Sequence, residues 1–423
     1  MPARRAGCAV TTLVVVIFLT VYLGMILGGL PFLQLDRTGI ALLGAIALVG
    51  IGAVTPEQAA QSVHTPTLIL LFSFMVISAQ MRLGGFYAWV TRGIAELPLP
   101  PPLLLGALIL VVAVLSAVFS NDIVCLAVAP VLVDACLKRR LDPVPYLLAL
   151  ACSANIGSAA TLIGNPQNML IGETLRLSFG DYATEAAVPV LCGLLAAWLI
   201  ILLAVRGRWQ LRDDASSARA PERRDAEPLH LDGWQTVKGL GVAVALIGLF
   251  LFSSWPREVA ALTGAGALLL SRKLHSSKML GLVDWELLIL FVGLFVVNHA
   301  LEQTGVTALA IADLAAAGID IAHPGPLFGA TFVLSNVVSN VPAVMLLLPA
   351  ATHPMAGALL ALVSTFAGNL LIVGSIANII VVDAAARRGV RIDWRVHARV
   401  GVPVTVATLS MTGAYLVWRL GAT

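Results

Sequence analysis

The residues of this chain that could do chemistry are amides and hydroxyls that stand inside apolar stretches. Two Ser-Asn pairs are the clearest case: Ser120-Asn121, which is followed by Asp122, and Ser339-Asn340, which is followed by Val341. Asn, Ser and Thr offer neutral hydrogen-bond donors and acceptors at a small desolvation cost. Such groups can hold a small polyhydroxy or oxyanion solute in an apolar environment and release it again.

Two further stretches, Ser153–Asn168 and Ser364–Asn378, are rich in Gly and polar residues and interrupt apolar segments. Unwound backbone is costly in lipid and survives only where it surrounds a cavity. The half-helices of such a break offer free N–H groups and a positive dipole end at their N-termini, and the freed carbonyls suit cations or hydroxyl donors. We expect both pairs and both breaks to form one site.

The residues expected to bind substrate or ion are amides, hydroxyls, glycines and one acid. They are Ser120, Asn121, Asp122, Asn155, Gly157, Ser158, Thr161, Gly164, Asn165, Asn168, Ser339, Asn340, Thr365, Gly368, Asn369, Gly374, Ser375 and Asn378. For any single one, close helix packing or capping of a break is an equal alternative. The occurrence of the same chemistry twice along the chain favours a binding role.

The composition defines the elements that must position these residues. Of the 423 residues, 59% are hydrophobic and only 12% are charged, and the mean hydropathy is +0.94. A soluble domain has about a quarter of its residues charged. Apolar runs such as Cys8–Leu30 and Ala187–Val205 are long enough to match a bilayer core, and helices satisfy their own backbone there. The sequence therefore predicts an all-α polytopic membrane protein.

Several classes of function are excluded by missing motifs. There is no GxxxxGK[ST] loop and no soluble segment that could hold one, which argues against an ATP-driven pump. There is no HExxH motif, the seven His are scattered, and the five Cys lack CxxC spacing. We therefore expect no enzyme, no cofactor and no metal site. The expected partners are a small inorganic solute or anion and the lipid bilayer, without nucleic acid.

The chain carries an internal duplication. Four blocks recur in the same order: Ala41–Ala45 as Ala261–Ala265, Leu68–Leu83 as Leu287–Glu302, Ser120–Pro130 as Ser339–Pro349, and Leu162–Asn168 as Ile372–Asn378. The last block is offset by 210 positions and the two before it by 219. Such a duplication is typical of transporters built from two inverted-topology repeats. Each half is predicted to contain a re-entrant helical hairpin and a broken helix, with about 11 spans plus the two hairpins in all.

The predicted boundaries follow from this alignment. The first repeat is 1–178, with a hairpin at 103–137 and a broken helix at 145–178, and a linking span follows at 179–205. A cytoplasmic linker is expected at 206–236. The second repeat is 237–385, with a hairpin at 325–350 and a broken helix at 357–385, and 386–423 holds a basic loop and a final span. Two of the spans, 39–53 and 257–271, are short.

The distribution of charge supports an inverted arrangement. If the two halves have opposite orientation, one face carries all of the 26 Lys and Arg except five: Arg4, Arg5, Arg176, Arg257 and Arg419. Cytoplasmic faces carry this excess of positive charge. We therefore expect a bacterial inner-membrane protein with its 206–236 linker in the cytoplasm and its N-terminus outside. A cleaved signal peptide at Met1–Leu30 is the alternative for the first span.

Asp122 is the one acid of the expected site. An ionisable side chain in the membrane interior is expensive and is by default a functional group. Because its counterpart is Val341, we expect Asp122 alone to couple transport to protons, with a structural partnership to Asn155 or Asn165 as the alternative. Surface or packing roles are favoured for four weaker candidates: His299, Glu302, Cys125 and Cys152.

At these residues the sequence resembles the ion transporter superfamily, which includes arsenite-efflux permeases, dicarboxylate/sodium symporters, the melanosomal P protein and plant silicon-efflux transporters. The resemblance covers nearly the whole chain. It is most specific at Ser120-Asn121-Asp122 and Ser153–Asn168, where the segment Gly164–Asn168 is most similar to the silicon-efflux and arsenite-efflux branch. This implies a homodimer in which each protomer has a scaffold and a mobile transport domain that moves as an elevator.

The sequence departs from one branch of that superfamily. The sodium-dicarboxylate branch has paired Ser-Asn-Thr tips that help to bind sodium and carboxylate, whereas Asp122 and Val341 stand in the third positions here. Neither tip nor break contains Lys or Arg, which favours a neutral hydroxide such as arsenous or silicic acid. We expect proton-coupled efflux of a small metalloid hydroxide or oxyanion by secondary active transport. The alternatives are sodium-coupled uptake of dicarboxylate or sulfate and a channel-like anion permease.

Overall fold

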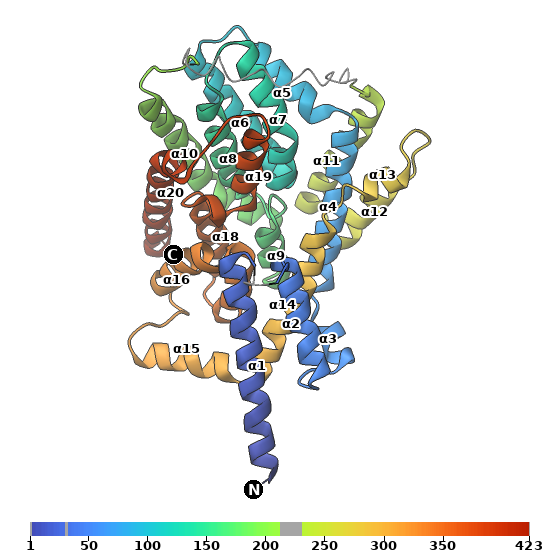
Figure 1. Ribbon diagram of the computed structural model, residues 1–423, viewed down its shortest axis with the longest axis vertical. Coiled ribbons are helices and arrows are strands. Elements are labelled where there is room, and N and C mark those ends of the chain that lie inside the picture. The colour runs from blue at the N-terminus through green and yellow to red at the C-terminus, as the bar shows by residue number, and fades with distance from the viewer. Residues whose placement is uncertain (1, 30–32, 212–230, 423) are drawn as a thin grey trace.

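The computed structural model describes residues 2–29, 33–211 and 231–422, and over these residues the chain is helical with no β-strand (Figure 1). Most of the expected linker 206–236 lies outside them. The first ten helices are α1 (Pro2–Leu27), α2 (Arg37–Gly50), α3 (Pro56–Ser62), α4 (Thr65–Leu83), α5 (Phe86–Glu96), α6 (Pro101–Val118), α7 (Asn121–Lys138), α8 (Pro143–Ser158), α9 (Pro166–Thr174) and α10 (Phe179–Val205).

The remaining helices repeat this order. They are α11 (Gly233–Phe252), α12 (Arg257–Leu269), α13 (Ser276–Leu280), α14 (Trp285–Gln303), α15 (Val306–Ala316), α16 (Pro324–Val338), α17 (Asn340–Leu347), α18 (Ala356–Ala367), α19 (Ile376–Ala386) and α20 (Trp394–Ala422), with short 3-10 turns at Leu348–Ala350 and Ile372–Gly374.

Two sets of ten helices therefore stand in the same order, α1–α10 and α11–α20. α4 and α14 each have 19 residues, and α5 and α15 each have 11. The hairpins are α6–α7 and α16–α17, and the broken helices are α8–α9 and α18–α19. The long helices α10 and α20, which the sequence indicated only as a linking span and a final span, take the tenth place in each set.

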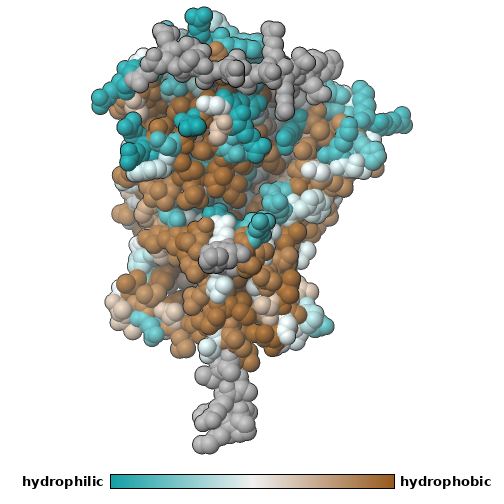
Figure 2. Space-filling model, in the orientation of Figure 1, coloured by the Kyte–Doolittle hydropathy of each residue, from teal (hydrophilic) through white to brown (hydrophobic). Residues whose placement is uncertain are grey.

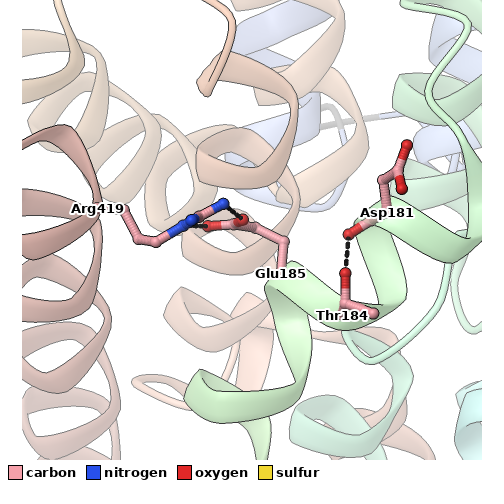
Figure 3. A network of polar contacts seen from close by, with 4 residues as sticks. All are labelled: Asp181, Thr184, Glu185 and Arg419. Carbon is pink, nitrogen blue, oxygen red and sulfur yellow. Dashed lines mark hydrogen bonds and ion pairs between the residues drawn. The ribbon is translucent and has the colours of Figure 1, made fainter. Parts of the chain in front are cut away.

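The two sets run in opposite directions. α1 begins at the lower end of the view in Figure 1, whereas α11 begins towards its upper end. α10 and α20 pack together, and Glu185 near the start of α10 accepts two hydrogen bonds from Arg419 near the end of α20, at 2.7 and 3.3 Å (Figure 3). A contact between the start of one helix and the end of the other requires the tenth helices to be antiparallel.

Among the described residues, seven helices are long and apolar enough to cross a bilayer: α1, α4, α6, α10, α11, α14 and α20. α2 and α12 lie at the short spans expected at 39–53 and 257–271, but they have only 14 and 13 residues. A helix needs about 20 residues to cross. Most of the expected spans that lack a long helix correspond to α2, α12 and the broken helices α8–α9 and α18–α19.

Helices of the two sets pack in exchanged pairs. α2 packs on α14, and its repeat equivalent α12 packs on α4. With α1 and α11, these four helices form one unit, which we call the scaffold group. α6–α10 and α16–α20 form a second unit, the site group, in which α8 contacts α6, α7 and α10. The hairpins and breaks all belong to the site group.

The outer surface is apolar around the middle of the molecule. Figure 2 shows a wide hydrophobic band, with hydrophilic residues gathered at the upper end of the view. Exposed Leu and Val side chains on α1, α6, α10 and α11 contribute to this surface, such as Leu19, Val114, Leu203 and Val244. Such a band matches a bilayer core.

Three helix starts outside the centre of the site group are capped by an Asp side chain. The Asp142, Asp232 and Asp284 carboxylates accept hydrogen bonds from the backbone N–H groups of Val144, Gln235 and Leu287, at 3.0, 3.2 and 2.9 Å. Asp is a strong N-cap because it satisfies an N–H that has no partner within the helix. These three capped starts differ from most of the helix starts at the centre of the site group.

Gly293 tests the scaffold contact between α14 and α2. A Cβ atom at this position would lie 2.7 Å from the carbonyl carbon of Ala41 and 2.9 Å from its oxygen, so the two backbones touch. We expect Gly293→Ala to lower the melting temperature in detergent by several degrees, because overpacking costs about 1–3 kcal/mol. Gly248→Ala is the control, since nothing lies within 4 Å of its position. Equal melting temperatures for the two variants would contradict this packing.

Candidate functional site

Both hairpin tips and both breaks lie together in the site group. α7 packs against α19 and α17 packs against α9, so each hairpin lies on the broken helix of the opposite set. The two tips are residues 119–120 and Ser339, and the two breaks are residues 159–165 and 368–375. The structure thus brings the four interruptions together, and a shared substrate site at this place stays a prediction.

Residues from all four interruptions line a cavity of about 30 Å³, which is room for about two water molecules. The lining consists of Asn121, Asp122, Ser339, Asn340 and Val341 from the tips, Pro166, Gln167, Ser375 and Ile376 from the breaks, and Leu287 from α14 of the scaffold group. None of these ten lining residues is Lys, Arg or His. Asp122 is the one acid among them.

Four helices begin at this cavity. α7 starts at Asn121, α9 at Pro166, α17 at Asn340 and α19 at Ile376. The first N–H groups of a helix have no partner within it, and the helix dipole adds partial positive charge at the same end. Helix starts with partial positive charge therefore line the cavity in place of basic side chains, although Pro166 has no N–H and the Asn121 N–H donates to the Gly164 carbonyl at 3.2 Å.

Three of these four starts have Ser at the N-cap position, yet none of the three side chains caps its own helix. These residues are Ser120, Ser339 and Ser375. Ser375 donates instead to the Oδ1 atom of Asn155 at 2.9 Å. Only at α9 does the N-cap act in the usual way, because Asn165 Oδ1 accepts from the backbone N–H of Asn168 at 2.9 Å.

The side chain of Asn155, at the end of α8, joins the first tip to the second break. Its Nδ2 atom donates to the Oδ1 atoms of Asn369 at 2.9 Å and Asn378 at 3.1 Å. Its Oδ1 atom accepts from Asn121 Nδ2 at 3.2 Å and from the Ser375 hydroxyl. Asn155 is buried, so one amide group fixes the relative positions of three segments.

The Thr365 side chain makes the corresponding hydrogen bonds to residues at the first break. Position 365 is equivalent to 155 at the repeat offset of 210. The Thr365 hydroxyl accepts from Asn165 Nδ2 and Gln167 Nε2, both at 3.2 Å, and lies 3.5 Å from Asn168 Oδ1. Exchanging the two halves converts the Asn155 contacts with Ser375 and Asn378 into the Thr365 contacts with Asn165 and Asn168. The hydrogen bonds therefore obey the same pseudo-two-fold relation as the helices.

Asn168 and Asn378 point into their own breaks rather than into the cavity. The Asn168 Nδ2 atom lies 3.0 Å from the carbonyl oxygen of Thr161 and 3.5 Å from that of Ser158. The Asn378 Nδ2 atom lies 3.0 and 2.8 Å from the equivalent carbonyls, of Leu371 and Gly368. Both amides thus satisfy carbonyls that the break has freed from helical hydrogen bonds.

Small residues allow the tips and breaks to approach each other. A Cβ atom on Gly164 would lie 2.7 Å from the carbonyl oxygen of Ser116, and the Gly164 carbonyl accepts from the Asn121 N–H at 3.2 Å. A Cβ atom on Gly368 would lie 3.1 Å from Asn340 Nδ2. The other expected small or hydroxyl residues pack in the same region: Gly157 against Ala113, Gly374 against Gly368, Ser158 with Asn155 and Asn165, and Thr161 with Ala117.

Two amide oxygens at the tips have no hydrogen-bond partner among the described residues. They are the Oδ1 atoms of Asn121 and Asn340, which are equivalent in the repeat and both buried. Asp122 likewise forms no ion pair with any described residue. Unsatisfied groups of this kind are costly in a protein interior unless a solute or water meets them. They all lie at the lining of the cavity.

The weaker candidates lie outside this constellation. His299 contacts Gln303 on an exposed part of α14, 2.9 Å between their nitrogens, and Glu302 is exposed beside it. Cys125 and Cys152 are buried free thiols. Pro166, Gln167, Leu287, Val341 and Ile376 line the cavity but were absent from the expected set. Gln167 stood beside the expected Asn165 and Asn168, whereas Leu287 carries no polar signal and its place follows only from helix packing.

Comparison with known proteins agrees with this architecture. Residues 13–367 match the family described as citrate transporter, CitMHS. An uncharacterized transporter of Mycobacterium tuberculosis is 29% identical over 412 residues, covering 90% of this chain and 94% of the relative. A silicon efflux transporter of Oryza sativa subsp. japonica is 30% identical over 464 residues, covering 90% of this chain and 92% of the relative.

A solved structure shares the fold. The Alcanivorax borkumensis YdaH transporter, whose crystal structure was described as having an unusual topology, aligns with a TM-score of 0.59 and 14% sequence identity over 98% of each chain. The two inverted sets of helices, each with a hairpin and a broken helix, are thus an arrangement seen in a transporter. This chain is a multi-span membrane transporter and belongs to the citrate transporter family, CitMHS, of the ion transporter and arsenite permease type.

Proposed function

We propose that this transporter exports a small metalloid hydroxide or oxyanion, such as arsenous or silicic acid, in exchange for protons. The observation that carries the proposal is the cavity where four helix N-termini meet, with one carboxylate and no basic side chain in its lining. Backbone N–H groups and amides can donate to the oxygens of a hydroxide or an oxyanion.

The size of the cavity supports a small solute. The cavity has room for about two water molecules, which suits a solute of few heavy atoms, and a tricarboxylate would need the tips to separate. The N–H groups at Asn340 and Ile376 face the cavity from two helices without a capping side chain. A solute with several oxygens around one atom could accept from several helix starts together.

Asp122 supports proton coupling. It lies in the first turn of α7, where the helix dipole stabilises a negative charge, and its equivalent in the second tip is Val341. A carboxylate that lines the cavity and has no ion-pair partner among the described residues can take up or lose a proton as the solute leaves or enters. The silicon efflux transporter among the relatives supports efflux of a hydroxide.

The packing supports an elevator mechanism, and the family resemblance implies that it operates in a homodimer. The site group holds the cavity except for Leu287, which belongs to the scaffold group, so the two groups meet at the substrate site. Movement of the site group along the scaffold would expose the cavity to each side in turn. The basic residues at 138–140 and 387–399 support a cytoplasmic position for the face that carries the 206–236 linker in a bacterial inner membrane.

Sodium-coupled uptake of a carboxylate or sulfate is the second candidate. The specific observation in its favour is the pair of equivalent amide oxygens, Asn121 Oδ1 and Asn340 Oδ1, which lack hydrogen-bond partners among the described residues. Amide oxygens are suitable ligands for a hard cation. The family description as citrate transporter also favours a carboxylate. A channel-like anion permease would move the same solutes without coupling to either gradient.

Proteoliposomes separate these possibilities. The purified protein would be tested with arsenite, silicate, sulfate, succinate and citrate under an imposed proton gradient, an imposed sodium gradient, or neither. Arsenite or silicate flux driven by the proton gradient is the expected result. Succinate or citrate flux driven by sodium would overturn the proposal in favour of the second candidate, and flux that ignores both gradients would indicate a channel.

Asp122→Asn tests the coupling group. The amide keeps the size of the side chain but cannot carry a charge, so proton-driven flux of arsenite or silicate should fall to background. Asp134→Asn, at the other end of α7, is the matched control. Its carboxylate is 59% exposed and pairs with Arg388 at 3.2 Å, an exposed interaction worth about 0–1 kcal/mol. Proton-driven flux that persists in Asp122→Asn would show that another group couples transport.

Asn155→Ala tests the joint between the tips and breaks. Loss of this amide leaves several buried polar groups unpaired, at about 1–3 kcal/mol each. We expect the half-saturating concentration of the transported solute to rise by about a hundredfold. Ser153→Ala on the same helix is the control, because the Ser153 hydroxyl bonds only to helical carbonyls, those of Ala149 and Leu150. An unchanged concentration dependence in Asn155→Ala would place the substrate elsewhere.

A further inference from the structure

Each break frees a backbone carbonyl at the end of its first half-helix, at Ala159 in the first half and at Asn369 in the second. These positions are equivalent at the repeat offset of 210. Both residues are fully buried. An unpaired carbonyl in such a place is costly, so each must find a donor outside its own helix.

The donor comes from the tenth helix of each set. The Tyr182 hydroxyl donates to the Ala159 carbonyl at 2.7 Å, and the His397 Nε2 atom lies 3.0 Å from the Asn369 carbonyl. Tyr182 is the fourth residue of α10 and His397 is the fourth residue of α20. The two aromatic side chains therefore occupy equivalent places. Each donates a hydrogen bond to a freed carbonyl, Tyr182 from a hydroxyl and His397 from an imidazole ring.

The hydrogen bond defines the state of the histidine ring. A carbonyl oxygen can only accept, so the Nε2 atom must carry the hydrogen, and in a neutral ring Nδ1 is then the unprotonated nitrogen. His397 is only 2% exposed. The backbone of α20 also comes close, because a Cβ atom on Gly401 would lie 2.8 Å from His397 Nε2 and would collide with the Asn369 carbonyl oxygen.

The two hydrogen bonds from the tenth helices differ in what their acceptor residues contact. Asn369 has a side chain whose Oδ1 atom accepts from Asn155 at 2.9 Å, and Asn155 in turn contacts Asn121 at the cavity. Ala159 has no such side chain. Tyr182 instead accepts a hydrogen bond from Asn168 at 3.1 Å. The Asn369 side chain therefore links its backbone directly to the Asn155 amide by a hydrogen bond, a link that Ala159 has no side-chain atoms to make.

We propose that Tyr182 and His397 are repeat-related braces of the two broken helices, and that His397 is a positioning residue for the substrate site. His397 fixes the Asn369 carbonyl, which fixes Asn155 and through it the first tip. The bracing role concerns the fold of the breaks and stands without the proposed function, whereas the effect on transport rests on it.

Amide hydrogen exchange of the full-length protein in detergent tests the bracing role without any substrate. His397→Leu should speed exchange at 368–375 by about tenfold, equivalent to about 1.4 kcal/mol, and leave 159–165 within about twofold of the wild type. Tyr182→Phe should give the opposite pattern. His397→Gln retains an N–H donor of similar reach and should restore slow exchange. His323→Gln, at an exposed histidine, is the control.

Flux in proteoliposomes tests the positioning role, with arsenite and silicate as probes. His397→Leu should raise the half-saturating concentration about tenfold with a smaller effect on the maximal rate. His397→Gln should return the half-saturating concentration most of the way to the wild-type value. The bracing role would be contradicted if exchange became uniformly faster along the chain in His397→Leu, or if it became faster at 159–165. Slow wild-type flux of both probes with the expected exchange pattern would uphold the braces and count against the proposed function instead.

Discussion

The structure depends on one constraint: backbone that leaves the helix inside an apolar bundle must find other hydrogen-bond partners. Two breaks and two tips are tolerated here because several freed carbonyls are each matched by a specific side chain. Asn168 and Asn378 serve carbonyls within their own breaks, and Tyr182 and His397 serve one carbonyl each from the tenth helices. Two groups that stay without a partner among the described residues, the Oδ1 atoms of Asn121 and Asn340, belong to residues that line the cavity.

The duplication explains why these partners exist in pairs, and its imperfections show where the halves have diverged. Asn155 and Thr365 occupy equivalent positions and each holds the break of the other half. The equivalents differ at the tips, where Asp122 corresponds to Val341, and at the breaks, where Asn165 caps α9 but Ser375 leaves α19 uncapped. A symmetric framework thus surrounds an asymmetric cavity, with the single carboxylate on one side.

Much of the fold could be predicted from the sequence because its signals are local. The Ser-Asn pairs and the Gly-rich stretch before Pro166 mark places where an apolar helix stops, and their repetition gives the two sets of helices. The direction of an individual side chain could not be predicted, since Asn168 and Asn121 look alike in sequence yet one faces its break and the other the cavity. The role of His397 could not be predicted, because the sequence indicates α20 only as a closing span without a counterpart in the first half.

The three serines that begin helices at the cavity without capping them, Ser120, Ser339 and Ser375, set stability against activity. A helix start whose side chain turns back onto its own N–H groups is more stable by about 1 kcal/mol. The same turn would remove donors that face the cavity. Under the proposed function, stronger capping at these three positions would raise the stability of the protein and weaken its binding of the solute.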